Sequence, residues 1–193
     1  MLQAKLFVDE GGSSGGVKIP VGIHSGAEFL GITTETTWSD INYGYEGRSI
    51  HKRLFKPTGG RPKEGETIQQ ALDRETARNL GQLVQVMEVF LGKDVVDNFE
   101  ATDYNSFIAS ASVMLNAKKG TKVHLKVVPD WKEQKYPDLP TYGTYVEILT
   151  EGKPTTLEFS KDELKAIGVM ELNRTSASSG GSAMASEDLG KLV

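Results

Sequence analysis

The centre of the chain holds two segments with strong helix signals, and β-rich stretches lie on either side of them. Thr67 and Gln70 have the spacing of a capping box, and apolar residues then recur at helical intervals until Gly92 provides a stop. Asp103 is a good N-cap for a second helix that ends near Asn116. The apolar stripes of both helices predict core packing. This order of strands, helices and strands predicts a β-rich α+β fold.

The stretch before the helices is predicted to form strands. Residues 17–38 are rich in β-branched residues, and glycines at positions 22, 26 and 31 indicate bulges in one long strand or a division into two short ones. Residues 40–47 have turn chemistry between aromatic residues, and residues 48–56 then resume as a strand. Residues 57–65 are predicted to be a linker that leads into the first helix.

The stretch after the helices is also predicted to be mainly β. Lys122, His124 and Lys126 alternate with aliphatic residues, which predicts a half-buried strand with a basic outer face. A loop over residues 129–140 follows, and then a strand over residues 141–149. We expect a further short strand over residues 155–159, and one or two helical turns over residues 161–167 that are capped by Ser160.

Glycine and serine are frequent near both ends of the chain, so both ends are expected to be flexible. We predict a flexible N-terminal segment over residues 1–16 and one domain over residues 17–172 with a helical insertion at 67–116. A flexible tail would occupy residues 173–193. The tip of that tail is acidic and apolar, and its candidate partner-binding residues are Glu187, Asp188, Leu189, Leu192 and Val193.

Positive charge is concentrated in two segments although the chain as a whole is acidic. The net charge is −4, so no global positive field indicates a nucleic-acid-binding protein. Residues 48–63 nevertheless contain six basic and no acidic side chains, and residues 118–135 contain six basic and two acidic ones. Charge runs commonly serve only to keep a surface solvated, and that interpretation stays open for either segment taken alone.

No combination of residues indicates catalysis. The chain has no cysteine, which excludes disulfides, thiolate metal sites and cysteine nucleophiles. The histidines at 24, 51 and 124 are far apart, and the acidic residues between 94 and 103 lack the pattern of a calcium loop. We interpret those acidic residues as helix-terminal and solvated, and we expect a protein that is not an enzyme and needs no cofactor or metal.

The sequence predicts neither a membrane span nor a secretory signal. No apolar run approaches the roughly 20 residues that a membrane helix needs. The first residues of the chain lack the apolar stretch of a signal peptide. We therefore expect a cytoplasmic protein that is not secreted.

Aromatic residues accompany both basic segments, a combination suited to single-stranded nucleic acid. Lysine and arginine neutralise phosphates, and aromatic faces stack on unpaired bases, each stack contributing about 1–3 kcal/mol. Large rings often pack in the core instead, so burial stays open for each ring taken alone. Trp131 and Tyr136 are the strongest candidates because they lie between lysines in a loop. The complete candidate set is Tyr43, Tyr45, Arg48, Lys52, Arg53, Phe55, Lys56, Lys122, Lys126, Trp131, Lys132, Lys135, Tyr136 and Tyr142.

Several segments together resemble bacteriophage single-stranded DNA-binding proteins of the OB-fold type. The resemblance rests on residues 19–24, the basic strand at 48–55, the central helices, and residues 126–128 and 139–143. It implies a five-stranded Greek-key barrel that holds nucleic acid across one face of its sheet. It further implies binding of single-stranded DNA without sequence preference in replication, recombination or repair, and a tail that recruits proteins of those processes. The central helical insertion is longer than the single helix of that family.

Two other functional classes stay open. A structural or assembly protein, for example a virion component, would use the same lysines only as a solvated surface and would act through protein contacts. A nucleic-acid enzyme would need metal-binding carboxylates, which only residues 94–103 offer. A homo-oligomer is compatible with each of these classes.

Overall fold

The computed structural model describes residues 18–60 and 62–179, with the side chains up to residue 173. Three strands come first: β1 (Gly22–Thr34), β2 (Trp38–Tyr45) and β3 (Arg48–Phe55). The helices α1 (Ile68–Leu91), α2 (Lys93–Asp97) and α3 (Tyr104–Asn116) follow. The chain then forms β4 (Lys122–Pro129), β5 (Pro137–Asp138), β6 (Val146–Ile148) and α4 (Lys161–Ser179). The predicted order of strands, helices and strands, and the α+β class, are confirmed.

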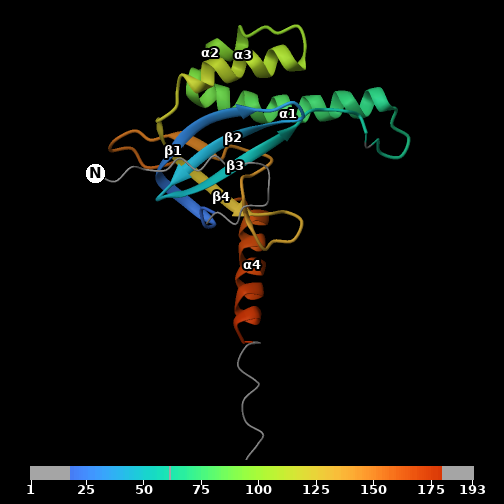
Figure 1. The fold of residues 1–193 in the computed structure, drawn as a ribbon. Helices are drawn as coiled ribbons and strands as arrows, with labels where there is room; N and C mark the ends of the chain where they lie inside the picture. Colours follow the sequence, from blue (N-terminus) through green and yellow to red (C-terminus); the bar gives the residue numbers. More distant parts are fainter. Residues whose placement is uncertain (1–17, 61, 180–193) are drawn as a thin grey trace, which may run out of the picture.

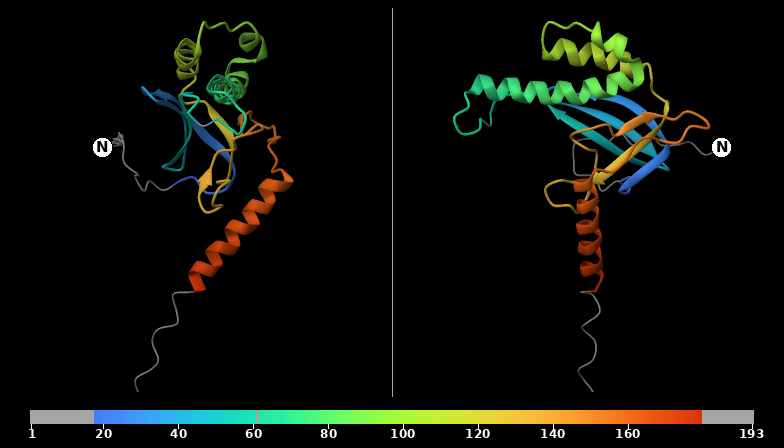
Figure 2. Two further views of the ribbon diagram at one scale, coloured as in Figure 1. Left: turned by 90° about the vertical axis from the view of Figure 1, so that its right-hand side faces the viewer. Right: turned by 180° about the vertical axis from the view of Figure 1, so that it is seen from behind.

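The strands form one curled antiparallel sheet with helices on two sides. Its order is β3-β2-β1-β4-β5, and β6 also pairs with β4. Helices α1 to α3 lie together on one side of the sheet, and α4 leaves the opposite side and points away from it (Figures 1 and 2). Among the described residues no helix is both long and apolar enough to cross a membrane.

The curl of the sheet depends on two bulges in β1. The pairing register shifts between Ser25 and Ala27 and again between Phe29 and Gly31. Gly31 has a φ of +93°, and a Cβ there would collide with the side chains of Asn116 and Lys119. Only glycine fits this position without strain, and the bulge bends the long strand around the core. Of the two predicted alternatives, the single strand with bulges is the observed one.

The turn between β2 and β3 is shorter than predicted. The prediction of a turn over residues 40–47 is wrong, because β2 continues to Tyr45 and only Glu46 and Gly47 form the turn. Both turn residues have positive φ, at 50° and 74°, as a two-residue hairpin turn of type I′ requires. The short turn fixes a register in which Trp38 lies directly opposite Phe55.

The core lies between the inner face of the sheet and α1. The rings of Phe29 on β1 and Phe90 on α1 stack with their centroids 4.3 Å apart. Both predicted helix starts are confirmed, since capping boxes form at Thr67 and at Asp103. The end of α3 is held by Asn116, whose side-chain amide exchanges two hydrogen bonds with the backbone of Ile32 on β1. The helices therefore close one end of the curled sheet.

The predicted basic outer face of β4 is wrong. His124 and Lys126 are only 5% and 6% exposed, because β1, β5 and β6 flank the strand and α4 packs against it. Lys126 Nζ donates to the carbonyl of Glu158 at 3.0 Å and to the carboxylate of Glu163 at 3.1 Å. Residue alternation distinguishes the two faces of a strand, but it does not reveal whether a second element covers the outer face.

A side chain links β3 and β5, the first and last strands in the order of the sheet. No backbone ladder joins β3 to β5 within the described residues. Instead, Lys52 Nζ on β3 donates to the carbonyl of Leu139 at 2.6 Å and to the hydroxyl of Thr141 at 3.2 Å, and lies 3.9 Å from the carboxylate of Asp138. The structure is thus a six-stranded open sheet with a lysine at the seam.

The strand and the helix near the C-terminus differ in length from those predicted. The strand predicted over residues 141–149 is confined to Val146–Ile148, and residues 155–159 form no strand. Ser160 caps α4 as predicted, but the helix runs to Ser179 and so includes residues 173–179, which were assigned to the flexible tail. The predicted flexible segment at 1–16 and the candidate partner-binding residues 187–193 lie outside the described residues.

Candidate functional site

Every exposed aromatic side chain in the described part of the chain belongs to β3 or to the segment after β4. Phe55 is 62% exposed on β3, and Trp131, Tyr136 and Tyr142 are 76%, 58% and 78% exposed. All four are in the candidate set predicted from the sequence. Solvent-facing rings of this size are unusual in a chain with a well-packed core, so they mark a candidate binding surface.

Asp130 organises the loop between β4 and β5. Its carboxylate accepts hydrogen bonds from the backbone N–H groups of Glu133, Lys135 and Tyr136 at 2.8 to 2.9 Å. Partial burial alone would raise the pKa of Asp130, but these donors outweigh it and hold the pKa below its usual value. The loop is therefore fixed by one carboxylate, and it presents Trp131, Lys132, Lys135 and Tyr136 to solvent.

Replacing Asp130 by alanine should loosen this loop without unfolding the domain. The variant loses charge-assisted bonds to three backbone donors, so we expect trypsin to cut after Lys132 and Lys135 about tenfold faster, a local loss of about 1.4 kcal/mol. Glu151→Ala, which removes an exposed carboxylate outside this loop, is the matched control, and its loop should be cut at the wild-type rate. Equal rates for wild type and Asp130→Ala would show that the carboxylate does not hold the loop.

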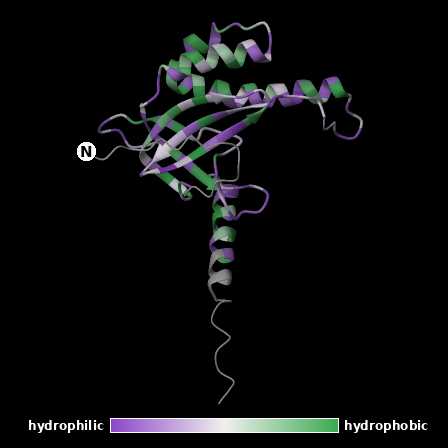
Figure 3. Ribbon diagram, in the orientation of Figure 1, coloured by the Kyte–Doolittle hydropathy of each residue, from purple (hydrophilic) through white to green (hydrophobic). Residues whose placement is uncertain are grey.

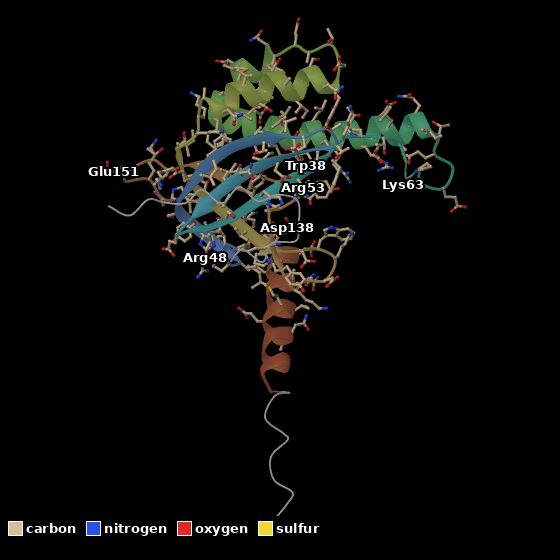
Figure 4. The ribbon with its side chains drawn as sticks, viewed as in Figure 1. Trp38, Arg48, Arg53, Lys63, Asp138 and Glu151 are labelled. Carbon is tan, nitrogen blue, oxygen red and sulfur yellow. The ribbon has the colours of Figure 1, made fainter. Side chains whose placement is uncertain are left out.

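The outer face of the β2–β3 hairpin carries a second aromatic group. Trp38 lies opposite Phe55, and the Arg53 guanidinium sits 4.1 Å from the centroid of the Trp38 ring (Figure 4). Arg53 also makes a bidentate ion pair with the buried Asp40, at 2.9 and 2.7 Å, and this hydrogen bonding raises the pKa of Arg53. His51 Nε2 lies 3.8 Å from the same carboxylate. Arg53 therefore holds the indole in place, and its charge is largely balanced.

Trp38 was missed by the sequence prediction, although a signal for it existed. If Glu46 and Gly47 are taken as a two-residue turn, counting back along both strands places Trp38 opposite Phe55. The longer turn predicted over residues 40–47 concealed this pairing.

The seam at Lys52 holds part of the segment after β4 beside β3. Lys52 neighbours Arg53 on β3, and its bonds to Leu139 and Thr141 hold the segment that carries Tyr136 and Tyr142 beside that strand. Figure 4 shows Asp138 below Arg53 and Trp38, with Arg48 toward the opposite end of β3. We take the outer face of β2 and β3 together with the loop at 130–136 as the candidate surface.

Three predicted contact residues are buried and do not form part of this surface. Tyr43 has no exposed area, and its ring packs edge-on to Tyr145 with centroids 6.1 Å apart. Lys52 and Lys126 are 8% and 6% exposed, and each is bonded to the carbonyls of packed segments. These predictions are wrong because both lysines satisfy the backbone of neighbouring loops, and Tyr43 lies on the inner face of β2.

The remaining candidates are accessible to different degrees. Tyr45 is half-buried against the ring of His24, with centroids 4.9 Å apart. Lys122 is exposed, but its ammonium pairs with Glu28 on β1 at 2.7 Å. Arg48 and Lys56 are exposed at the two ends of β3. Lys56, Lys132 and Lys135 are each exposed next to an exposed ring, and the ammonium of Lys135 lies 3.5 Å from the carboxylate of Glu133.

The acidic residues at 94–103 are helix-terminal and solvated, as predicted. Asp97 pairs with Lys93 at 2.7 Å within α2, and Asp103 caps α3. Within residues 18–60 and 62–179 no three histidine or acidic residues are close enough to hold a metal ion.

Figure 3 shows hydrophilic residues along much of β3 and around the loop after β4. The arrangement is thus one of cations and rings, without a metal cluster in the described residues.

Comparisons of the chain with known protein families, with curated proteins and with solved structures found no match.

Proposed function

We propose that this protein binds single-stranded DNA without sequence preference and protects or organises it in replication, recombination or repair. The observation that carries the proposal is the position of the four exposed aromatic side chains, which all lie on β3 or on the segment after β4, part of which Lys52 holds beside β3. Rings that face solvent next to lysines suit unpaired bases, because every base has a face to stack. Phosphates would be neutralised by Lys132, Lys135 and Lys56.

The topology supports the same proposal. We infer that the sheet is an open variant of the OB-fold, because an antiparallel β1-β2-β3 meander pairs through β1 with β4, and the helices lie between β3 and β4. In that fold, oligonucleotides bind on the face of strands 2 and 3 and on the loops after strands 1 and 4. Here Trp38 and Phe55 lie on the corresponding strands, and Trp131 and Tyr136 lie in the loop after β4.

Fluorescence anisotropy of a labelled thymine oligonucleotide tests the proposal directly. We expect saturable binding that resists duplex competitor and weakens as salt rises, because phosphate contacts release counterions. No binding even at low salt would overturn the proposal. The exposed rings would then be left for protein contacts, as in a structural or assembly protein.

Substituting the two loop lysines should reduce the salt dependence of binding. In the double variant Lys132→Gln/Lys135→Gln, each lost phosphate contact lowers the slope of log affinity against log salt by about 0.7. Lys165→Gln, at an exposed position on α4, is the matched control and should leave the slope unchanged. An unaltered slope in the double variant would mean that neither lysine contacts phosphate.

A further inference from the structure

A cleft lies where the β1–β2 turn, the ends of β2 and β3, and α3 meet. Its volume is about 250 Å³, and its walls come from the turn residues Thr34 to Thr36, from Trp38 and Lys56 at the ends of the strands, and from one side of α3. The α3 residues are Tyr104, Asn105, Ile108, Ala109 and Ser112. This volume is below the roughly 300–1,000 Å³ of pockets for drug-sized ligands. It suits a single ring system better than a peptide segment.

The walls combine flat, apolar and hydroxyl groups. Leu54, Ile108 and the indole of Trp38 provide apolar surface. The hydroxyls of Thr34, Ser39 and Ser112 also line the cleft. They contact one another only at 3.3 and 3.4 Å, so they keep hydrogen-bonding capacity for another partner. An aromatic wall next to spare donors and acceptors matches a nucleobase, which is flat and has a polar edge.

Two charged side chains of the cleft are uncommitted. Glu35 and Lys56 are both exposed, and neither forms an ion pair within the described residues. The carboxylate can accept a hydrogen bond from the N–H groups that each base carries on its pairing edge. The ammonium can neutralise the phosphate of the same nucleotide. The cleft thus offers groups for each part of one nucleotide.

A buried asparagine links two of the elements that border the cleft. The side-chain amide of Asn79 on α1 donates to the carbonyl of Phe55 at 2.5 Å, and Asn79 is 3% exposed. Burial raises the pKa of Tyr104, and a hydrogen bond with Asn79 opposes that rise. Asn79 on α1 therefore links the start of α3 to the end of β3.

We propose that this cleft receives one nucleobase of a bound single strand, with its phosphate at Lys56. The proposal rests on the proposed function. It extends the path of the bound DNA from the outer face of β2 and β3, past Trp38, to the helical insertion. Trp38 belongs to both the outer face and the cleft. One nucleotide would then turn away from the bases stacked on the sheet, and its base would lie between the β1–β2 turn and α3.

Photocrosslinking distinguishes this placement from binding on the sheet alone. Thymine oligonucleotides that carry 5-iodouracil at one position at a time are irradiated with the full chain, and the adducts are mapped by mass spectrometry. We expect an adduct on Tyr104, which lines the cleft from α3. The variant Ala109→Phe fills the cleft from an exposed position on α3 and should lower the Tyr104 adduct about tenfold or more, because the base loses its contact surface.

Controls separate failure of the cleft from failure of binding. Ser110→Phe adds the same ring one residue along α3, outside the cleft, and should keep the adduct. Thr36→Phe fills the cleft from the opposite wall and replaces Ala109→Phe if that variant does not fold. Saturable binding with adducts only on the loop aromatics, or an unchanged Tyr104 adduct in the filled variants, overturns the cleft proposal alone. Absence of any oligonucleotide binding overturns the proposed function and the cleft with it.

Discussion

Removing the two loop aromatics should weaken binding of single-stranded DNA at least about 30-fold while leaving the fold intact. Each base stack contributes about 1–3 kcal/mol, so loss of two stacks in Trp131→Ala/Tyr136→Ala costs at least about 2 kcal/mol of binding. Both side chains are mostly exposed, and the hydrogen bond that anchors Tyr136 to Asp130 uses its backbone N–H. The free energy of unfolding should therefore change by less than about 0.5 kcal/mol.

The measurement pairs anisotropy titrations with urea unfolding of the same preparations. Val113→Ala is the control, since it removes a 74% exposed apolar side chain from α3, outside the candidate surface. It should change neither quantity. If the double variant loses stability in proportion to affinity, the rings serve packing. If it keeps full affinity, base stacking does not involve this loop.

Lys52→Ala should have the opposite signature, lowering stability with little direct effect on DNA binding. The variant leaves the carbonyl of Leu139 and the hydroxyl of Thr141 without their donor at the seam beside β3. Hydrogen bonds to charged groups contribute about 1.5–3 kcal/mol each, so we expect the free energy of unfolding to fall by about 2–3 kcal/mol. Burial lowers the pKa of Lys52, and although Asp138 opposes this, Arg78 adds to it, so holding the charge has a cost.

Unfolding in urea measures the stability change, and anisotropy below the unfolding transition measures affinity. Lys56→Ala removes an exposed lysine four residues further along and should leave stability within about 0.5 kcal/mol of wild type. Lys52→Met keeps the apolar stem and should lose less stability than Lys52→Ala. A Lys52→Ala protein of normal stability with a reduced salt slope would restore Lys52 as a phosphate contact.

Site residues with a local sequence signal were predicted, and those whose role depends on a neighbouring strand were missed or only partly described. The four exposed aromatics were all in the predicted set, and for Trp131 and Tyr136 the local signal was their position between lysines in a loop. Trp38 was missed because its role depends on pairing with Phe55 across the hairpin. Arg53 was in the predicted set, but its pairing with Asp40 could be found only from the neighbouring strand.

The sequence by itself determined the local structure. Capping boxes at Thr67 and Asp103 and the stop at Gly92 set helix boundaries through bonds between residues close in the chain. Gly26 and Gly31 marked the bulges of β1 in the same way, since glycine adopts a positive φ without the steric cost that a Cβ imposes. The α+β class follows from the order of these elements.

Only the tertiary structure decided which side chains reach solvent. Lys126 alternates with aliphatic residues as surface lysines do, whereas Lys52 shares the inner face of β3 with Ile50 and Leu54. Segments distant in sequence cover both lysines and use their ammonium groups as donors. The candidate cleft also combines a turn near residue 35 with a helix that begins at Tyr104. Burial depends on which elements pack together, and the periodicity of one strand does not carry that information.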